Sequence, residues 1–191
     1  MRAFRALFSL LATFVVVVAA SSEAQAFERQ WQAGLSAGYT HFVNYAAVNA
    51  ASFPGFGTSL SLSYGITDAI NIIGHVDFSA HPGKAPVLIY GGGAGVAYVI
   101  DIVRWVPWIG ATVGGYAVSN VGSCAPTADA PCTTGRFALS PIAGLDYQFT
   151  RKFSLGAVGR YDLLLFGKAG DPSSIDHAIS IFARAQYIWG Y

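Results

Sequence analysis

Eight stretches of the chain alternate bulky apolar side chains with polar or small ones, and this period of two predicts β-strands. In residues 56–66, for example, Leu60, Leu62 and Tyr64 alternate with serine and glycine. The eight stretches are 31–42, 56–66, 70–80, 87–100, 105–118, 137–149, 153–165 and 177–191. Within 105–118 the alternation does not fix the phase around Gly114 and Gly115, which allows a β-bulge there.

The connections between these stretches alternate in length. Short turns at 67–68, 101–104 and 150–152 follow the second, fourth and sixth stretches. The other connections are longer, at 43–55, 81–86, 119–136 and 167–174. Outer-membrane barrels carry short turns on their periplasmic rim and longer loops on the outer rim. Eight strands would place both chain ends on the short-turn rim.

The chemistry of the two strand faces favours a membrane barrel over a soluble one. A soluble eight-stranded barrel or sandwich would turn the apolar face inward and carry Lys, Glu, Thr and Asn outside. Here the polar face is mostly Gly, Ser and Ala, which suits the crowded interior of a narrow barrel. Tyrosines and tryptophans near the strand ends suit the interfacial girdles. We expect an all-β fold, an eight-stranded antiparallel up-and-down transmembrane β-barrel.

The N-terminus has the pattern of a secretory signal peptide. Arg2 and Arg5 precede an apolar run, residues 6–20, and Ala24-Gln25-Ala26 offers a small-x-small cleavage site. The alternative is a membrane-spanning helix, but the run is shorter than the roughly 20 residues that a span needs. We therefore expect a cleaved signal peptide at 1–26 and a single barrel domain at 27–191.

Charge is scarce and balanced. Charged residues make up 11% of the chain, against about 25% in a typical soluble domain. Of 11 basic and 10 acidic residues, residues 1–26 contain two arginines and one glutamate, which leaves 9 of each sign in 27–191. The sequence therefore offers neither an electrostatic surface for nucleic acid nor a polybasic membrane patch.

The only two cysteines, Cys124 and Cys132, lie in the long connection 119–136. In an exported chain such a pair favours a disulfide that closes a small loop. A metal pair is the weaker alternative, because no histidine lies near them in the sequence. We expect no metal site and no cofactor.

Six residues of the polar faces form a predicted interior network, because buried charges must be paired. Asp77 and Arg160 are expected at the same height in the barrel, and Arg184 is expected to meet Asp146 across the strand between them. The six residues are His75, Asp77, Asp146, Arg160, Asp162 and Arg184. The network is either a static plug or the gate of a narrow pore, since eight strands leave only enough room for side chains.

An enzyme is the least favoured class. A lipid A deacylase would need a serine nucleophile beside a histidine and an acid. His177 follows Asp176 and precedes Ser180, and His75 lies near Asp77, but neither has the His-x-Ser spacing of that family. We therefore predict no catalytic residues.

Three segments resemble the small outer-membrane barrels of the OmpA/OmpX type. They are PWIGATVGGY at 107–116, SPIAGLDYQFTRKFSLGAVGRYD at 140–162 and the final YIWGY. The last is similar to the family's C-terminal assembly signal, carried here by Tyr187, Trp189 and Tyr191, although the family usually ends in phenylalanine or tryptophan. The resemblance implies recognition by the barrel-assembly machinery. It covers the whole chain after the signal peptide, and we expect no peptidoglycan-binding domain.

These features predict an integral protein of a Gram-negative outer membrane with a largely filled polar interior. A structural or surface-interaction role is favoured, with adhesion, ligand recognition or capping of the barrel mouth by the loops. A narrow, porin-like or OmpW-like channel for small solutes or small apolar molecules is the alternative, and a lipid-modifying enzyme comes third. The expected partners are outer-membrane lipid, lipopolysaccharide and the assembly machinery, with no nucleic acid, and we expect a monomer.

Overall fold

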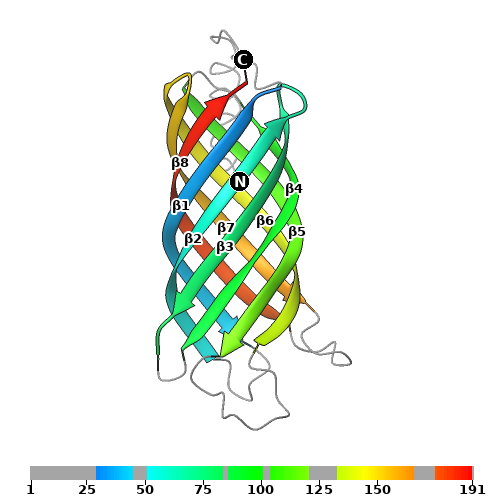
Figure 1. Ribbon diagram of the computed structural model, residues 1–191, viewed down its shortest axis with the longest axis vertical. Coiled ribbons are helices and arrows are strands. Elements are labelled where there is room, and N and C mark those ends of the chain that lie inside the picture. Colours follow the sequence, from blue (N-terminus) through cyan, green and yellow to red (C-terminus); the bar gives the residue numbers. More distant parts are fainter. Residues whose placement is uncertain are drawn as a thin grey trace, which may run out of the picture.

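A computed structural model describes residues 29–44, 51–83, 86–100, 104–120, 133–165 and 175–190, and they form a closed barrel (Figure 1). Each strand pairs antiparallel with the next, and β1 pairs with β8 to close the ring. The predicted eight-stranded antiparallel up-and-down barrel is confirmed. The strands are β1 (Trp31–Asn44), β2 (Ala51–Gly65), β3 (Ile70–His81), β4 (Val87–Val99), β5 (Trp105–Asn120), β6 (Thr133–Thr150), β7 (Phe153–Leu165) and β8 (Asp176–Trp189).

The barrel has two different rims. The rim at the top of Figure 1, here called the short-turn rim, carries the turns after β2, β4 and β6 and the end of β8. The β2–β3 turn is closed by a hydrogen bond from the Ile66 amide to the Ile70 carbonyl, and the Thr67 hydroxyl accepts from the Ile70 amide. The opposite rim, at the bottom of Figure 1, is here called the loop rim. Within the residues described, no helix is long and apolar enough to cross a membrane.

Bulky apolar side chains cover the outside of the barrel, and small or polar ones line the inside. Leu60, Ile109 and Ile181 on three different strands are 58%, 61% and 60% exposed. On the same strands Ser59, Thr112 and Ser180 point inward and are buried. The sequence therefore alternates as strands do when one face of the sheet meets an apolar environment and the other a crowded lumen.

Several strands extend beyond their predicted ends towards the loop rim. The predicted connection 43–55 is too long at both ends. Residues 43–44 belong to β1 and residues 51–55 to β2, because the two strands stay paired as far as Asn44 and Ala51. Likewise β6 begins at Thr133, not at residue 137, since it stays paired with β5. Pro54 is tolerated because it lies where β2 pairs with β1 alone.

The bulge that the sequence allowed near Gly114 and Gly115 does not form. β5 stays in register with both neighbouring strands through these residues. The irregularity lies instead in β6, between Gln148 and Thr150 at the short-turn rim. An unbroken β5 places Trp108 and Tyr116 inside the barrel, where both are buried.

Two layers of buried apolar side chains lie inside the barrel at different heights. The layer nearer the loop rim contains Phe42, Val87, Ile89, Val118 and Leu164, and Phe53 packs against Phe42 with ring centroids 6.0 Å apart. The layer nearer the short-turn rim contains Val99, Val106, Trp108, Val158 and Phe182. Charged side chains also lie in the interior, and they form ion pairs with one another.

Candidate functional site

An ion pair crosses the middle of the lumen. Alternation along β3 and β7 turns Asp77, Arg160 and Asp162 inward. Arg160 Nη1 lies 2.8 Å from Asp77 Oδ2, and Arg160 Nε lies 3.0 Å from Asp162 Oδ1. The side chains of Arg160 and Asp77 are only 6% and 7% exposed. One guanidinium thus links opposite walls of the barrel.

Neutral side chains complete this arrangement. The Tyr116 hydroxyl donates to Asp77 Oδ2 at 2.6 Å, and the Ser140 hydroxyl donates to Asp162 Oδ1 at 2.5 Å. His75 Nε2 lies 3.1 Å from the Tyr116 oxygen. Because the Tyr116 proton goes to Asp77, this histidine nitrogen must be the donor in that bond. We call these residues the central cluster: His75, Asp77, Tyr116, Ser140, Arg160 and Asp162.

Aromatic rings bracket the Arg160 guanidinium. Its carbon lies 6.0 Å from the centroid of Tyr116 and 5.9 Å from that of Phe182. Such faces attract a cation at low dielectric and exclude water from it. The Arg160 guanidinium is therefore held both by carboxylates and by packing against aromatic rings.

A second ion pair lies nearer the short-turn rim. Arg184 on β8 pairs with Asp146 on β6, and the Trp108 indole donates to Asp146 Oδ2 at 2.8 Å. The Arg184 guanidinium lies 4.4 Å from the Trp108 ring centroid. Asp146, Gly156 and Arg184 form one transverse row over β6, β7 and β8. The pair can pass over β7 because Gly156 has no side chain there.

A third ion pair lies nearer the loop rim, between Arg136 Nη2 and Asp176 Oδ2 at 3.0 Å. Sequence patterns missed this pair because Arg136 fell in a predicted loop and Asp176 just outside the predicted last strand.

His81 lies inside the barrel as well. Its Nδ1 lies 2.8 Å from the Phe53 carbonyl oxygen, and its Nε2 lies 3.1 Å from the Ser79 hydroxyl.

Two cavities in the described part of the lumen lie on either side of the central cluster. One of about 60 Å³ lies on the short-turn side, lined on one wall by Ser59, Ser61 and Ser63. The other, of about 20 Å³, lies on the loop side of the central cluster. Arg160 and Phe182 line both cavities. These two side chains therefore lie at the border of both cavities.

Asp176, His177 and Ser180, which lie close together in the sequence, do not come together in the structure. Ser180 is buried inside the barrel, whereas the His177 ring stacks on Tyr161 with centroids 5.5 Å apart on the outer face. Asp176 is turned towards Arg136. Among the residues that the structure describes, no group of three or more His, Cys, Asp or Glu side chains could hold a metal ion.

All six residues of the predicted interior network lie inside the barrel, but in two clusters. Arg160 forms ion pairs with both Asp77 and Asp162, and His75 contacts Asp77. Arg184 forms its ion pair with Asp146. Sequence reasoning missed Trp108, Tyr116 and Ser140 as their partners. Continuing the alternation of 105–118 without a bulge would have placed both aromatic residues in the lumen.

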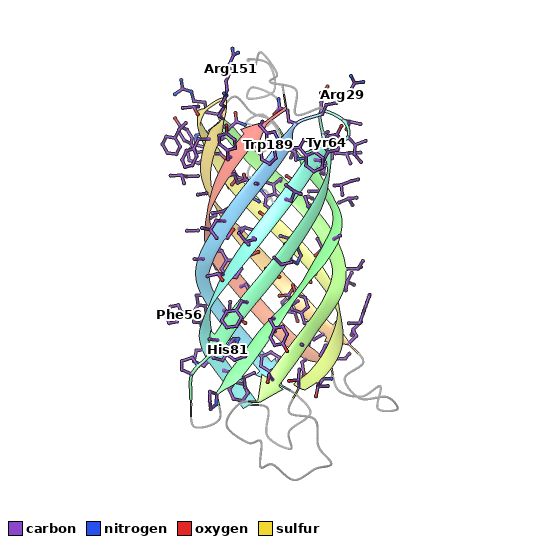
Figure 2. All side chains as sticks on the ribbon, in the orientation of Figure 1. Arg29, Phe56, Tyr64, His81, Arg151 and Trp189 are labelled. Atoms are coloured by element: carbon purple, nitrogen blue, oxygen red, sulfur yellow. The ribbon has the colours of Figure 1, made fainter. Side chains whose placement is uncertain are left out.

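Trp189 and Tyr187 from the predicted assembly signal lie on the outer face at the short-turn rim, with ring centroids 5.9 Å apart. Figure 2 shows Trp189 beside Tyr64 at this rim, far from His81 at the other. The residues of three predictions lie outside the described part of the chain: Tyr191, the pair Cys124 and Cys132, and the signal peptide 1–26. The assembly role of Tyr191, the disulfide and the signal peptide therefore remain predictions.

No protein-family model matches the sequence, and no curated protein matches it. Solved structures do match the fold. The Neisserial surface protein A barrel matches with a TM-score of 0.62 and 17% identity, covering 83% of this chain and 96% of that one. The N-terminal barrel domain of Pseudomonas aeruginosa OprF matches with a TM-score of 0.51 and 13% identity, covering 85% and 98%.

The attachment invasion locus protein Ail of Yersinia pestis, in complex with the heparin analogue sucrose octasulfate, also matches. Its TM-score is 0.51 at 14% identity, covering 83% of this chain and 99% of that one. The chain thus has the fold of the small eight-stranded outer-membrane β-barrels. This agrees with the resemblance to OmpA/OmpX-type barrels seen in the sequence.

Proposed function

We propose that the chain is an integral outer-membrane β-barrel with a closed lumen, which serves a structural or surface-interaction role and no catalytic one. The observation that carries this proposal is the Arg160–Asp77 ion pair that links opposite walls. Apolar layers lie in the lumen as well, towards both rims. A barrel filled in this way is a rigid support for its loops and has no open path for solutes.

The outer surface supports the membrane location. Its exposed side chains are large and apolar, which no soluble barrel of this size could leave uncovered. Aromatic pairs stand at the short-turn rim, with Trp31 against Tyr64 at 4.7 Å and Trp105 against Tyr147 at 4.9 Å between centroids. Such rings mark the boundary between lipid and water. The short-turn rim would then face the periplasm, and the loops the outside.

Folding into detergent tests the membrane location. Refolded protein is expected to need detergent or lipid for solubility and to migrate on a gel differently before and after heating. Protein that stays soluble and monomeric without detergent would overturn the proposal. The expected partners are outer-membrane lipid, lipopolysaccharide and, during insertion, the barrel-assembly machinery.

A surface role can be separated from a purely structural one through the longest loop. Replacing 121–132 with a short Gly-Ser linker would leave the eight strands intact. If the loops mediate surface interactions, this variant should lose binding to its surface partner and keep its heat-modifiable migration. Unchanged binding would assign the role to the barrel wall.

A narrow channel for small solutes or small apolar molecules, OmpW-like in kind, is the second candidate. The cavity of about 60 Å³ favours it, because serines line one wall and apolar side chains such as Val99 and Ile142 line another. Liposome swelling separates the candidates. A closed barrel predicts no swelling in small sugars, and a channel predicts swelling that depends on protein concentration.

A further inference from the structure

Two of the four histidines in the chain, His41 and His177, lie on the outer wall of the barrel, and the other two lie in the lumen. Among the outward-facing strand residues that the structure describes, none is Asp, Glu, Lys or Arg. The two histidines lie on β1 and β8, which pair with each other. The outer wall thus gathers its histidines in one place.

The strand register places both histidines side by side near the loop rim. His177 lies opposite Val43, two residues along β1 from His41. Diagonal neighbours of this kind lie about 7–8 Å apart on one face of a sheet. Tyr39, on the same face, lies opposite Phe56, which Figure 2 shows on the outer wall towards the loop rim. If the loops face the outside, as proposed above, this height is that of the headgroups in the outer leaflet.

Hydroxyl groups hold each imidazole ring in place. His41 Nδ1 lies 3.0 Å from the Tyr39 hydroxyl oxygen, and His41 Nε2 lies 3.0 Å from the Ser52 hydroxyl oxygen. His177 Nδ1 is hydrogen-bonded to the Tyr161 hydroxyl, and these two rings stack. We call these five residues the outer-wall patch: Tyr39, His41, Ser52, Tyr161 and His177. Four neighbouring strands, β7, β8, β1 and β2, contribute to it.

Tyr39, His41 and Ser52 carry one hydrogen-bond donor more than their own bonds use. With a neutral ring, the three side chains have three N–H or O–H protons, and their two hydrogen bonds use two of them. Whichever ring nitrogen carries the proton, one hydroxyl proton is left that none of the three accepts. Such a donor is costly on a wall that faces lipid, so an external acceptor is expected.

The surroundings of the patch favour an anionic acceptor. The carboxylate nearest in sequence, Asp176, is buried and points into the barrel, where it pairs with Arg136. When the His41 ring takes up a proton, both of its nitrogens donate and both neighbouring hydroxyls are free to donate outwards. The patch then presents a positive charge with two donors, an arrangement that suits the oxygens of a phosphate group.

We propose that the outer-wall patch binds a phosphate group of lipopolysaccharide in the outer leaflet. This inference rests on the membrane location and orientation proposed above. The wall beside the patch is apolar, because Phe56 and Ile181 lie opposite Tyr39, and Ile179 lies opposite His41, all three exposed. Acyl chains can pack on these side chains while the phosphate meets the patch. A lipid-anchored phosphate therefore fits this surface better than a free one.

Native mass spectrometry of the refolded barrel in detergent with added lipid A, the phosphorylated anchor of lipopolysaccharide, tests the proposal. The wild type should retain lipid A. In the double variant His41→Phe and His177→Phe the affinity should fall at least about tenfold, because hydrogen bonds to a charged group are lost. Phenylalanine keeps a flat ring on the wall. Lipid A without its phosphates should bind the wild type as weakly as lipid A binds the double variant.

Tyr98→Phe is the control, because it removes an exposed hydroxyl from the outer wall at the short-turn end of β4. It should bind lipid A as the wild type does. If the double variant loses its heat-modifiable migration, Tyr39→Phe with Ser52→Ala replaces it, since this pair removes both hydroxyls beside His41.

Equal retention of lipid A by the wild type and the folded variant would overturn the proposal, and so would equal retention of dephosphorylated lipid A. Competition by inorganic phosphate would also overturn it, because the patch would then be a site for free phosphate. None of these results would touch the membrane location, which fails only if the protein is soluble without detergent.

Discussion

Arg160 and Asp77 meet in the centre of the lumen, although their strands, β7 and β3, are separated by three strands in either direction around the ring. Their 2.8 Å ion pair thus links opposite walls of the barrel. Tyr116 and Phe182 flank the guanidinium, and Arg160 and Phe182 line a cavity on each side of it. The closed lumen that we propose has consequences for stability, packing and transport.

Breaking the Asp146–Arg184 pair should destabilise the barrel strongly. Asp146→Asn leaves the buried Arg184 charge without a carboxylate, which is expected to cost about 3–5 kcal/mol. The same change in an Arg184→Met background should cost much less, because the two residues are coupled. Urea unfolding of the four proteins in lipid vesicles measures both values. Equal costs in the two backgrounds would show that the pair contributes nothing specific.

Gly156 should not tolerate a side chain, although it lies in a regular strand. A methyl group there would collide with the Asp146 carboxylate and the Leu145 carbonyl. Gly156→Ala is therefore expected to cost about 1–3 kcal/mol. Gly159→Ala on the same strand is the control, because a methyl there meets nothing within 4 Å. Similar stabilities of the two variants would show that the space between Asp146 and Arg184 can accommodate a methyl group at position 156.

A charge on the outer wall should be costly in proportion to its depth. Val76 lies at mid-height of β3 and is 58% exposed, whereas Ile70 begins the same strand at the short-turn rim. In a membrane, Val76→Arg is expected to cost about 2–4 kcal/mol and Ile70→Arg about 0–1 kcal/mol. Unfolding from lipid vesicles gives these values. If both substitutions were equally harmless, the wall would not face lipid.

Deleting Tyr191 should slow assembly more than it lowers the stability of the assembled barrel. The proposed signal also uses Tyr187 and Trp189, which lie stacked on the outer face. Pulse-chase analysis of heat-modifiable protein in cells measures assembly, and unfolding after refolding in vitro measures stability. Normal assembly without Tyr191 would make the end of β8 an ordinary part of the wall.

Much of this architecture follows from the period-two pattern, because side chains that alternate strictly in type must alternate between lumen and wall. That pattern alone placed Asp146 opposite Arg184, two strands away. It left Tyr116 unplaced, since glycine at 114 and 115 carries no side chain to mark the phase and a bulge there was allowed. Nor did it find Arg136 with Asp176, because strand pairing, not hydrophobicity, extends β6 and β8 towards the loop rim.

Planar-bilayer recording tests the closed lumen most directly. Wild-type protein is expected to give no discrete conductance steps. A neutral variant that combines Arg160→Met, Asp77→Asn and Asp162→Asn should fold, because no buried charge of the cluster is left unpaired. It should also give no conductance steps, because the apolar layers towards both rims still occupy the lumen. Arg104→Met, at an exposed turn, serves as the control and should stay silent. Discrete steps in the wild type that grow when Arg160 or Arg184 is neutralised would contradict the closed barrel and establish a gated channel.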